Sequence, residues 1–299
     1  MFKKILVPLD GSALSEASLG AAAVLAQKLH APVTLLHVIE QGAPAQVHEE
    51  HHLTGAEEAE SYLRKVAERG FPQGVEVHTH VHTAPVADVA RSIVEHATKE
   101  FQPDLIVTCT HGRGGVRDVL FGSIAQQVVA HGTTPLLLIK PGGRPFQLQC
   151  ILLPLDADSY HDDSLEPGAS LARIFNSSLE LLSVIPTYRT LAGEQALASS
   201  LMPAATQAML DLQEQNARHH LSEHVRTFDQ AGLTAAAIVA RGEPASTIVK
   251  TAEQLPADLI ILSTHRKAGI GAFWARSVAP KVAQLTKTPL LLIPLPEKQ

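Results

Sequence analysis

Short apolar runs alternate along the chain with longer segments whose apolar residues recur at helical spacing. In the first half the runs lie at 5–10, 32–39, 75–81, 105–109 and 135–139. The segments between them, at 12–29, 55–69, 86–100 and 123–130, each place their apolar residues on one helical face. Strands and helices in strict alternation predict a parallel α/β sheet with helices on both of its faces.

The same pattern begins again after a glycine- and proline-containing linker at 142–145. Four anchors recur in order: Ile-Leu-Val-Pro-Leu-Asp (5–10) as Ile-Leu-Leu-Pro-Leu-Asp (151–156), Asp-Leu-Ile-Val (104–107) as Asp-Leu-Ile-Ile (258–261), Thr-His (110–111) at 264–265, and Pro-Leu-Leu-Leu-Ile (135–139) at 289–293. The separation grows from 146 between Asp10 and Asp156 to 154 between His111 and His265, so eight extra residues lie between these anchors. We expect them within 186–228, in a long amphipathic helix. The repeat predicts a tandem duplication with domains at 1–143 and 147–299.

Composition limits the class of protein. The chain has 299 residues, a net charge of −6 and 45% apolar residues, and it shows no basic stripe with interleaved aromatic residues. We therefore expect no nucleic-acid partner. The apolar run at the N-terminus is too short for a signal peptide, and no run approaches the ~20 residues that span a bilayer. With only two cysteines, Cys109 and Cys150, a disulfide framework is not expected. These features predict a cytoplasmic protein without a membrane partner.

A polar loop at 110–121, with glycines at 112, 114 and 115, follows the fourth apolar run and precedes Gly122-Ser123, a helix-start signal. Backbone N–H groups of such a loop and of a helix N-terminus bind phosphate. The chain contains no G-x-x-x-x-G-K-[ST], and Arg117 interrupts a G-x-G-x-x-G pattern. We interpret the loop as a phosphate-binding loop of another kind; the alternative is a surface loop without a ligand.

The pattern that fits is Gly112, nine residues, then Gly122-Ser123, placed after Thr110-His111 at a strand end. Together with Pro-x-Asp at 8–10, His-Val at 37–38 and the Pro-Leu-Leu-Leu-Ile strand, it resembles the universal stress protein family. Nucleotide-binding members of that family carry G-x2-G-x9-G-[ST] after the fourth strand. The resemblance covers essentially the whole chain as two copies. It implies two tandem Rossmann-like domains of the adenine nucleotide alpha-hydrolase-like type, each a doubly wound, five-stranded parallel sheet.

The resemblance also implies an adenine-nucleotide site in the first domain. Pro8, Leu9 and Asp10 would face the adenine, with the Asp10 carboxylate accepting from its amino group. Val38 would pack against the base, and Thr108 and Cys109 would line the ribose side. The phosphates would be bound through backbone N–H groups and the Ser123 hydroxyl by Gly112, Arg113, Gly122, Ser123 and Ile124. Cys109 stands where the family motif has its first glycine, so we expect a tightened pocket. The expected ligand is ATP, with or without Mg²⁺, and other adenine nucleotides remain open.

The second copy departs further from the motif, because Arg266 and Arg276 replace its two remaining glycines. An arginine at a helix N-terminus would fill the volume of a phosphate, and Arg266 removes easy access to positive φ. We predict that this copy does not bind ATP as the first does. The alternative is that the two arginines bind an anion themselves.

The chain contains sixteen histidines, and three groups of them are candidates for binding a metal ion. These are His78, His80 and His82 on one strand, His48, His51 and His52 before the second helix, and the pair His220 and His224. The alternative is a set of exposed polar residues. Because no cysteine or firm ligand spacing supports a metal, we predict none. His111 lacks the nucleophile and orienting Asp of a catalytic triad, and Cys109, at the end of a buried strand, is interpreted as inert.

The resemblance implies an ATP- or adenine-nucleotide-binding regulatory protein of the stress-response type with little or no hydrolysis. No carboxylate base or Mg²⁺ pair aimed at a γ-phosphate is evident. One alternative is a nucleotide-independent interaction scaffold with vestigial pockets. An enzyme of the related pyrophosphatase group is disfavoured, because the first strand ends in Pro-Leu-Asp-Gly-Ser rather than Ser-Gly-Gly-x-Asp-Ser. The two fifth strands are expected to pair as an intramolecular pseudo-dimer; homodimerisation is left open.

Overall fold

The structure is a computed structural model of the whole chain, and it describes residues 1–43, 46–47, 50–110, 123–156, 164–191, 197, 200–265 and 278–295. The chain divides into two compact units. The first comprises 1–147, 264–280 and 289–299, and the second comprises 148–263 and 281–288. Within the described ranges no helix has the length and apolar character needed to cross a membrane.

The first unit is built on a sheet whose strands follow the order β12-β7-β6-β1-β2-β5, where β12 is the last strand of the chain (Leu290–Leu295). The strands of the first sequence copy are β1 (Ile5–Pro8), β2 (Val33–Glu40), β5 (Val77–Val86), β6 (Leu105–Cys109) and β7 (Leu136–Ile139). These five run parallel to one another, as the sequence pattern predicts. A separate two-stranded ribbon consists of β3 (Gln46–Val47) and β4 (Glu50–His51).

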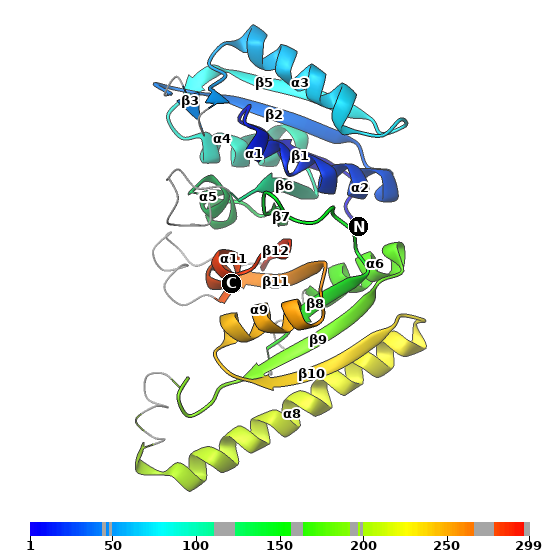
Figure 1. The fold of residues 1–299 in the computed structure, drawn as a ribbon, viewed down its shortest axis with the longest axis vertical. Helices are drawn as coiled ribbons and strands as arrows, with labels where there is room; N and C mark the ends of the chain where they lie inside the picture. The colour runs from blue at the N-terminus through cyan, green and yellow to red at the C-terminus, as the bar shows by residue number, and fades with distance from the viewer. Residues whose placement is uncertain are drawn as a thin grey trace. The chain divides into compact units, whose positions relative to one another are not determined.

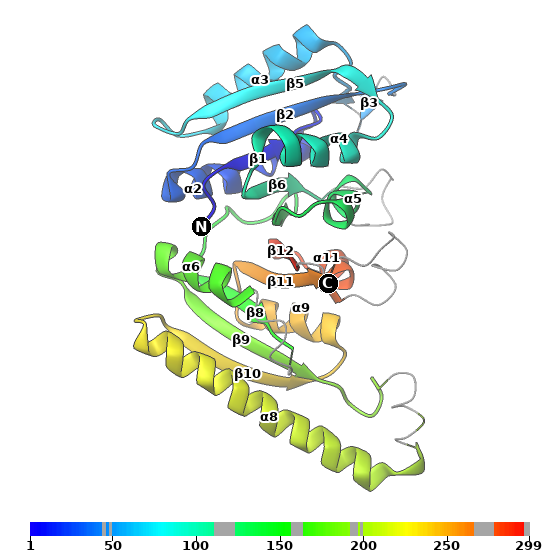
Figure 2. The same cartoon turned by 180° about the vertical axis from the view of Figure 1, so that it is seen from behind.

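Helices cover both faces of this sheet (Figure 1). One face carries α1 (Ala13–Glu16), α2 (Leu19–Leu29) and α3 (Ala56–Gly70), and the other carries α4 (Val89–His96), the π-helix η1 (Ala97–Phe101) and α5 (Ser123–His131) (Figure 2). The central strands are buried between these layers. Leu6, Leu35 and Ile106, for example, are at most 1% exposed.

Two helix boundaries differ from the sequence prediction. The helix expected at 12–29 is broken into α1 and α2, because serine hydroxyls bond to the backbone there: Ser15 Oγ donates to Ser12 O, and Ser18 Oγ donates to Ser15 O. The helix expected from residue 86 begins at Val89. Asp88 sets this start as N-cap, since its Oδ1 accepts from Arg91 N at 2.9 Å.

One repeated anchor has a structural role in both units. Asp104 Oδ2 accepts from the backbone N–H groups of Lys3 at 2.7 Å and Lys4 at 3.1 Å, just before β1. Its counterpart Asp258 accepts from Gln149 N at 2.8 Å and Cys150 N at 3.1 Å, where β8 begins. The Asp-Leu-Ile repeat thus ties the start of each copy's first strand to the start of its fourth strand.

The second unit contains four parallel strands in the order β10-β9-β8-β11. Its elements are β8 (Cys150–Pro154), α6 (Leu165–Phe175), β9 (Ser178–Ile185), α8 (Pro203–Gln230), β10 (Ala235–Arg241), α9 (Pro244–Gln254) and β11 (Leu259–His265). The helix α8 is the long helix predicted within 186–228, and it lies against β9 and β10. Its buried residues include Leu210, Ala217 and Leu221.

The chain ends with α11 (Val278–Leu285) and β12 (Leu290–Leu295). β12 belongs to the first unit and pairs antiparallel with β7, with Leu291 opposite Leu137. This pairing covers the edge of β7 that a parallel sheet of five strands would leave exposed.

Candidate functional site

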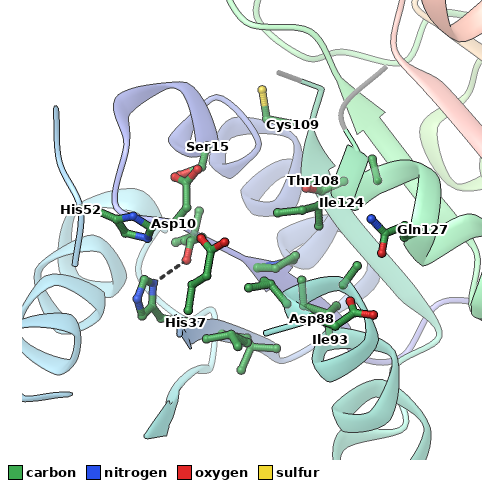
Figure 3. A pocket seen from close by; sticks show the side chains of 18 of the residues that line it. Asp10, Ser15, His37, His52, Asp88, Ile93, Thr108, Cys109, Ile124 and Gln127 are labelled. Carbon is green, nitrogen blue, oxygen red and sulfur yellow. Dashed lines mark hydrogen bonds between the residues drawn. The ribbon is translucent and has the colours of Figure 1, made fainter. Parts of the chain in front are cut away.

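A cavity of about 420 Å³ opens in the first unit at the carboxyl ends of β1, β2 and β6 (Figure 3). Its volume falls within the range of about 300–1,000 Å³ that is typical of small-molecule sites. The sheet order changes direction here, because β2 lies on one side of β1 and β6 on the other. Such switch points are where doubly wound folds bind ligands.

Asp10 follows β1 and is held in a fixed position at the cavity wall. Its Oδ1 accepts from Ser12 N at 2.9 Å and from Ser12 Oγ at 2.6 Å. Ser12 in turn caps α1 by accepting from Ser15 N. Gly11 allows this tight turn at φ +93°, and a side chain there would meet Leu53 Cδ1 at 2.7 Å. The Asp-Gly-Ser sequence therefore presents a preorganised carboxylate.

His37, near the end of β2, connects two walls of the cavity. Its ring is 1% exposed; Nδ1 lies 2.8 Å from the carbonyl oxygen of Leu9 and Nε2 lies 3.1 Å from that of Leu53. The ring thereby holds the end of β1 against the segment before α3. The neighbouring Val38, 6% exposed, supplies apolar lining.

Thr108 and Cys109 line the cavity at the end of β6. Burial, with a smaller effect of Asp10, raises the pKa of the Cys109 thiol to about 12, and Lys140 opposes this only in part. The thiol is therefore neutral near pH 7, in agreement with the interpretation of Cys109 as inert.

The opposite wall comes from the first turns of α4 and α5. Asp88 and Ile93 contribute from the α4 side, and Ile124 and Gln127 from α5. Figure 3 shows His37 and His52 on one side of the cavity, with Ile124 and Gln127 across from them. Ile124 is 40% exposed, so an apolar side chain at the start of α5 remains available to a ligand.

Among the described residues, the side chains with a full charge that line the cavity are acidic. Asp10, Glu40 and Asp88 are lining residues, and the described lining contains no lysine or arginine. Carboxylates accept hydrogen bonds from amino and hydroxyl groups and repel phosphate. The arrangement suits a neutral, donor-rich group such as a base or a sugar rather than a phosphate.

Most of the predicted site residues come together here. The cavity lining contains Pro8, Leu9, Asp10, Val38, Thr108, Cys109 and Ile124. Gly112, Arg113 and Gly122 lie outside the described residues, as does the side chain of Ser123, which begins α5. The predicted roles of these residues toward a nucleotide remain predictions.

His52 is a lining residue that sequence reasoning placed instead in a group of surface histidines. It is 5% exposed, and its Nδ1 is buried without a hydrogen-bond partner among the described residues. A buried, unpaired ring nitrogen at a cavity wall is a group that a ligand can satisfy. No periodicity marks this position, because it precedes α3 in an irregular segment.

The corresponding region of the second unit is only partly described. Asp156, the counterpart of Asp10, is exposed. Arg266 and Arg276 lie outside the described residues. The predicted loss of nucleotide binding in this copy therefore stays a prediction.

Comparisons with known proteins agree with the fold and the repeat. The sequence model of the universal stress protein family matches residues 1–140 and again residues 148–294. Universal stress protein MJ0531 of Methanocaldococcus jannaschii is 33% identical over 146 residues, which cover 47% of this chain and 83% of that protein. A universal stress protein of Mycolicibacterium smegmatis is 23% identical and covers 97% of this chain and 96% of its own length.

Among solved structures, a universal stress protein from Archaeoglobus fulgidus has a TM-score of 0.72 at 16% identity, covering 97% of this chain and 96% of that chain. A putative universal stress protein from Pseudomonas aeruginosa has a TM-score of 0.68 at 16% identity, covering 98% of this chain and 93% of that chain. At such identities these structures support the fold alone. Since the family model matches twice and spans nearly the whole sequence, the chain belongs to the universal stress protein family and carries two copies of its domain in tandem.

Proposed function

We propose that this chain is a regulatory protein that binds an adenine nucleotide, with ATP as the expected ligand, in the cavity of its first domain at 1–143. The observation that carries the proposal is the cavity at the switch point, where the preorganised Asp10 carboxylate, Val38 and Thr108 line one volume. A carboxylate fixed beside apolar walls matches a flat base that carries an amino donor.

The acidic lining divides the proposed ligand into two parts. The base and ribose would occupy the cavity, where carboxylates accept from their amino and hydroxyl groups. The phosphates would lie outside it, toward the start of α5, where Ile124 is exposed and backbone N–H groups begin the helix. The predicted loop residues Gly112, Arg113, Gly122 and Ser123 precede or form that helix start. Mg²⁺, if bound, would accompany the phosphates.

Little or no hydrolysis is proposed for the same site. Oδ1 of Asp10 accepts from Ser12, and Oδ1 of Asp88 caps α4. Both carboxylates thus have structural roles, and neither is proposed as a general base toward the phosphates. A nucleotide held in this way would act as a regulatory ligand.

A second candidate, the nucleotide-independent scaffold, is favoured by the pairing of β12 with β7. The two Pro-Leu-Leu-Leu-Ile strands meet there in antiparallel register. We propose that this pairing joins the two sequence copies as an intramolecular pseudo-dimer, with the second domain at 147–299 keeping the fold and losing the ligand. This arrangement is compatible with nucleotide binding by the first domain, but would also serve a protein with vestigial pockets.

Calorimetric titration of ATP into the purified full chain distinguishes these candidates. We expect one ATP per chain, and a Kd raised by about 10- to 100-fold in Asp10→Asn, because a hydrogen bond to a charged acceptor contributes about 1.5–3 kcal/mol. Asp156→Asn, the same change in the second copy, is the matched control and should leave the Kd unchanged. Equal effects of the two substitutions, or no ATP binding by the unaltered chain, would contradict the proposal.

A further inference from the structure

A compact group of metal-ligating side chains lies on the first unit, on the α4 side of the edge strand β5. It consists of His80 on β5, His96 at the end of α4 and Glu100 in η1. One potential ligand atom from each lies within 4.8 Å of the others. Three elements, the strand β5 and the consecutive helices α4 and η1, thus bring two imidazoles and a carboxylate together.

The Glu100 carboxylate faces both imidazoles. Its Oε2 lies 2.7 Å from His96 Nδ1, and its Oε1 lies 3.8 Å from His80 Nδ1. A tetrahedral Zn²⁺ with bonds of about 2.0–2.2 Å separates its ligand atoms by roughly 3.4 Å. One of these two separations is shorter and the other longer than this value, and all three ligand atoms lie within 4.8 Å of one another, so small side-chain adjustments would close the site.

His82 supplies a partner for the remaining nitrogen of His96. Its Nδ1 lies 3.0 Å from His96 Nε2. If His96 binds a metal through Nδ1, its Nε2–H donates to His82, which fixes the tautomer and orientation of the ring. Such outer partners are usual for metal-binding histidines. Phe101 stacks on the His96 ring at a centroid distance of 5.7 Å and restricts it further.

The surroundings leave the three ligands accessible. The nearby cations Arg91 and Lys99 each pair with Glu95 rather than with Glu100 in the described contacts. A hollow of about 340 Å³ along His96 and Glu100 gives an ion access from solvent.

The backbone at this place is also unusual, because α4 passes into a π-helix that carries Glu100 and Phe101. Helical turns of this kind are rare and occur frequently at functional sites. The π-helix places Glu100 beside His96 while Phe101 stays stacked against the same ring.

We propose that His80, His96 and Glu100 form a binding site for a divalent transition metal, with Zn²⁺ as the best match to two imidazoles and one carboxylate. Three protein ligands leave one tetrahedral position for water. The site is separate from the proposed nucleotide function and does not depend on it. It differs from the sequence prediction of no metal, which considered His78, His80 and His82 along the strand and did not include α4.

The test is a titration of Zn²⁺ alone into the full chain from which a chelator has removed bound metal. Calorimetry measures the binding, and thermal unfolding is recorded with and without zinc. We expect one tight equivalent and a zinc-dependent rise in Tm. His96→Ala should weaken binding at least about 100-fold, since loss of an outer partner alone costs 10- to 100-fold. Because His96 is half-buried, its replacement can itself affect folding, so Glu100→Gln is the second variant. Its exposed carboxylate can be changed with little effect on folding, and it should weaken zinc binding similarly.

Two controls are available in the chain. His78, on the same strand, is 59% exposed and lies near Glu76 instead of the site, so His78→Ala should bind zinc as the unaltered chain does. His224→Ala removes the separate His220–His224 pair, whose Nε2 atoms are 3.3 Å apart. This variant should still bind one zinc ion tightly. Co²⁺ should give the absorption of a tetrahedral ion, lost in Glu100→Gln.

The proposal is overturned if the unaltered chain binds no zinc, or if His96→Ala and Glu100→Gln bind it as tightly as His78→Ala. In either case the group is a chain of hydrogen bonds from His82 through His96 to Glu100.

Discussion

Replacing Gly11 with alanine tests whether the turn after β1 is as confined as the structure shows. Gly11 has φ +93°, and an added Cβ would lie 2.7 Å from Cδ1 and 2.8 Å from Cγ of Leu53. Leu53 is 7% exposed, and its carbonyl oxygen faces His37 Nε2. The substitution therefore strains the backbone and displaces a side chain that is held at the cavity wall.

The loss in free energy of unfolding can be estimated from these contacts. An L-residue in the left-handed region costs about 1–2 kcal/mol, and forcing an extra methyl group into a packed site typically costs about 1–3 kcal/mol. Because the leucine can move partly aside, we expect a total of about 2–4 kcal/mol. For a domain of this size such a loss lowers Tm by roughly 5–15 °C. The affinity for ATP should fall as well, because Gly11 joins Asp10 to Ser12.

Gly20→Ala is the matched control, because it is the same chemical change in the same unit. Gly20 lies near the start of α2, and nothing is found within 4 Å of a Cβ built there. Alanine favours the helix, so this variant should be stabilised by up to about 1 kcal/mol. Thermal unfolding followed by circular dichroism, with and without ATP, compares the two. A Gly11→Ala protein that melts at the same temperature as the unaltered chain would show that the turn after β1 is not confined in this way.

Four further outcomes are expected. Asp104→Ala should lower stability by about 1–2 kcal/mol in chemical denaturation, since two backbone N–H groups lose a charged acceptor that is itself exposed to water; an unchanged midpoint would contradict this. His52→Leu should raise the Kd for ATP by about 3- to 10-fold, the value of one net hydrogen bond, and an unchanged Kd in calorimetry would remove His52 from the site. In a Cys150→Ser background, Cys109 should resist alkylation at pH 8 until the chain is unfolded. Stability should fall as the pH rises from about 9 toward 12, because the unfolded thiol ionises before the buried one. Rapid labelling of the native protein would contradict that prediction.

The sequence predicted the parallel sheet, the order of elements and the duplication, because buried strands and amphipathic helices leave strong periodic patterns. It also predicted the convergence of Asp10, Val38 and Cys109, since residues that follow parallel strands gather at one edge of the sheet. The break between α1 and α2 was missed because serine hydroxyls bond to the backbone locally without interrupting the apolar pattern.

The remaining features depend on tertiary contacts, which cannot be predicted from the local sequence pattern. His52 reaches the cavity from an irregular segment. The group of His80, His96 and Glu100 forms only when α4 packs near β5. Alternation along the strand grouped His80 with His78 and His82 instead, and His78 lies near Glu76. The acidic character of the cavity also arises from three separate elements, since Asp10, Glu40 and Asp88 come from the ends of β1 and β2 and from the start of α4.

Native mass spectrometry of the freshly purified full chain tests directly whether the first domain holds an adenine nucleotide. We expect a mass increase of about one adenine nucleotide per chain, lost in Asp10→Asn and retained in Asp156→Asn. A chain that carries no nucleotide, and whose Tm does not change when ATP is added, would contradict this expectation.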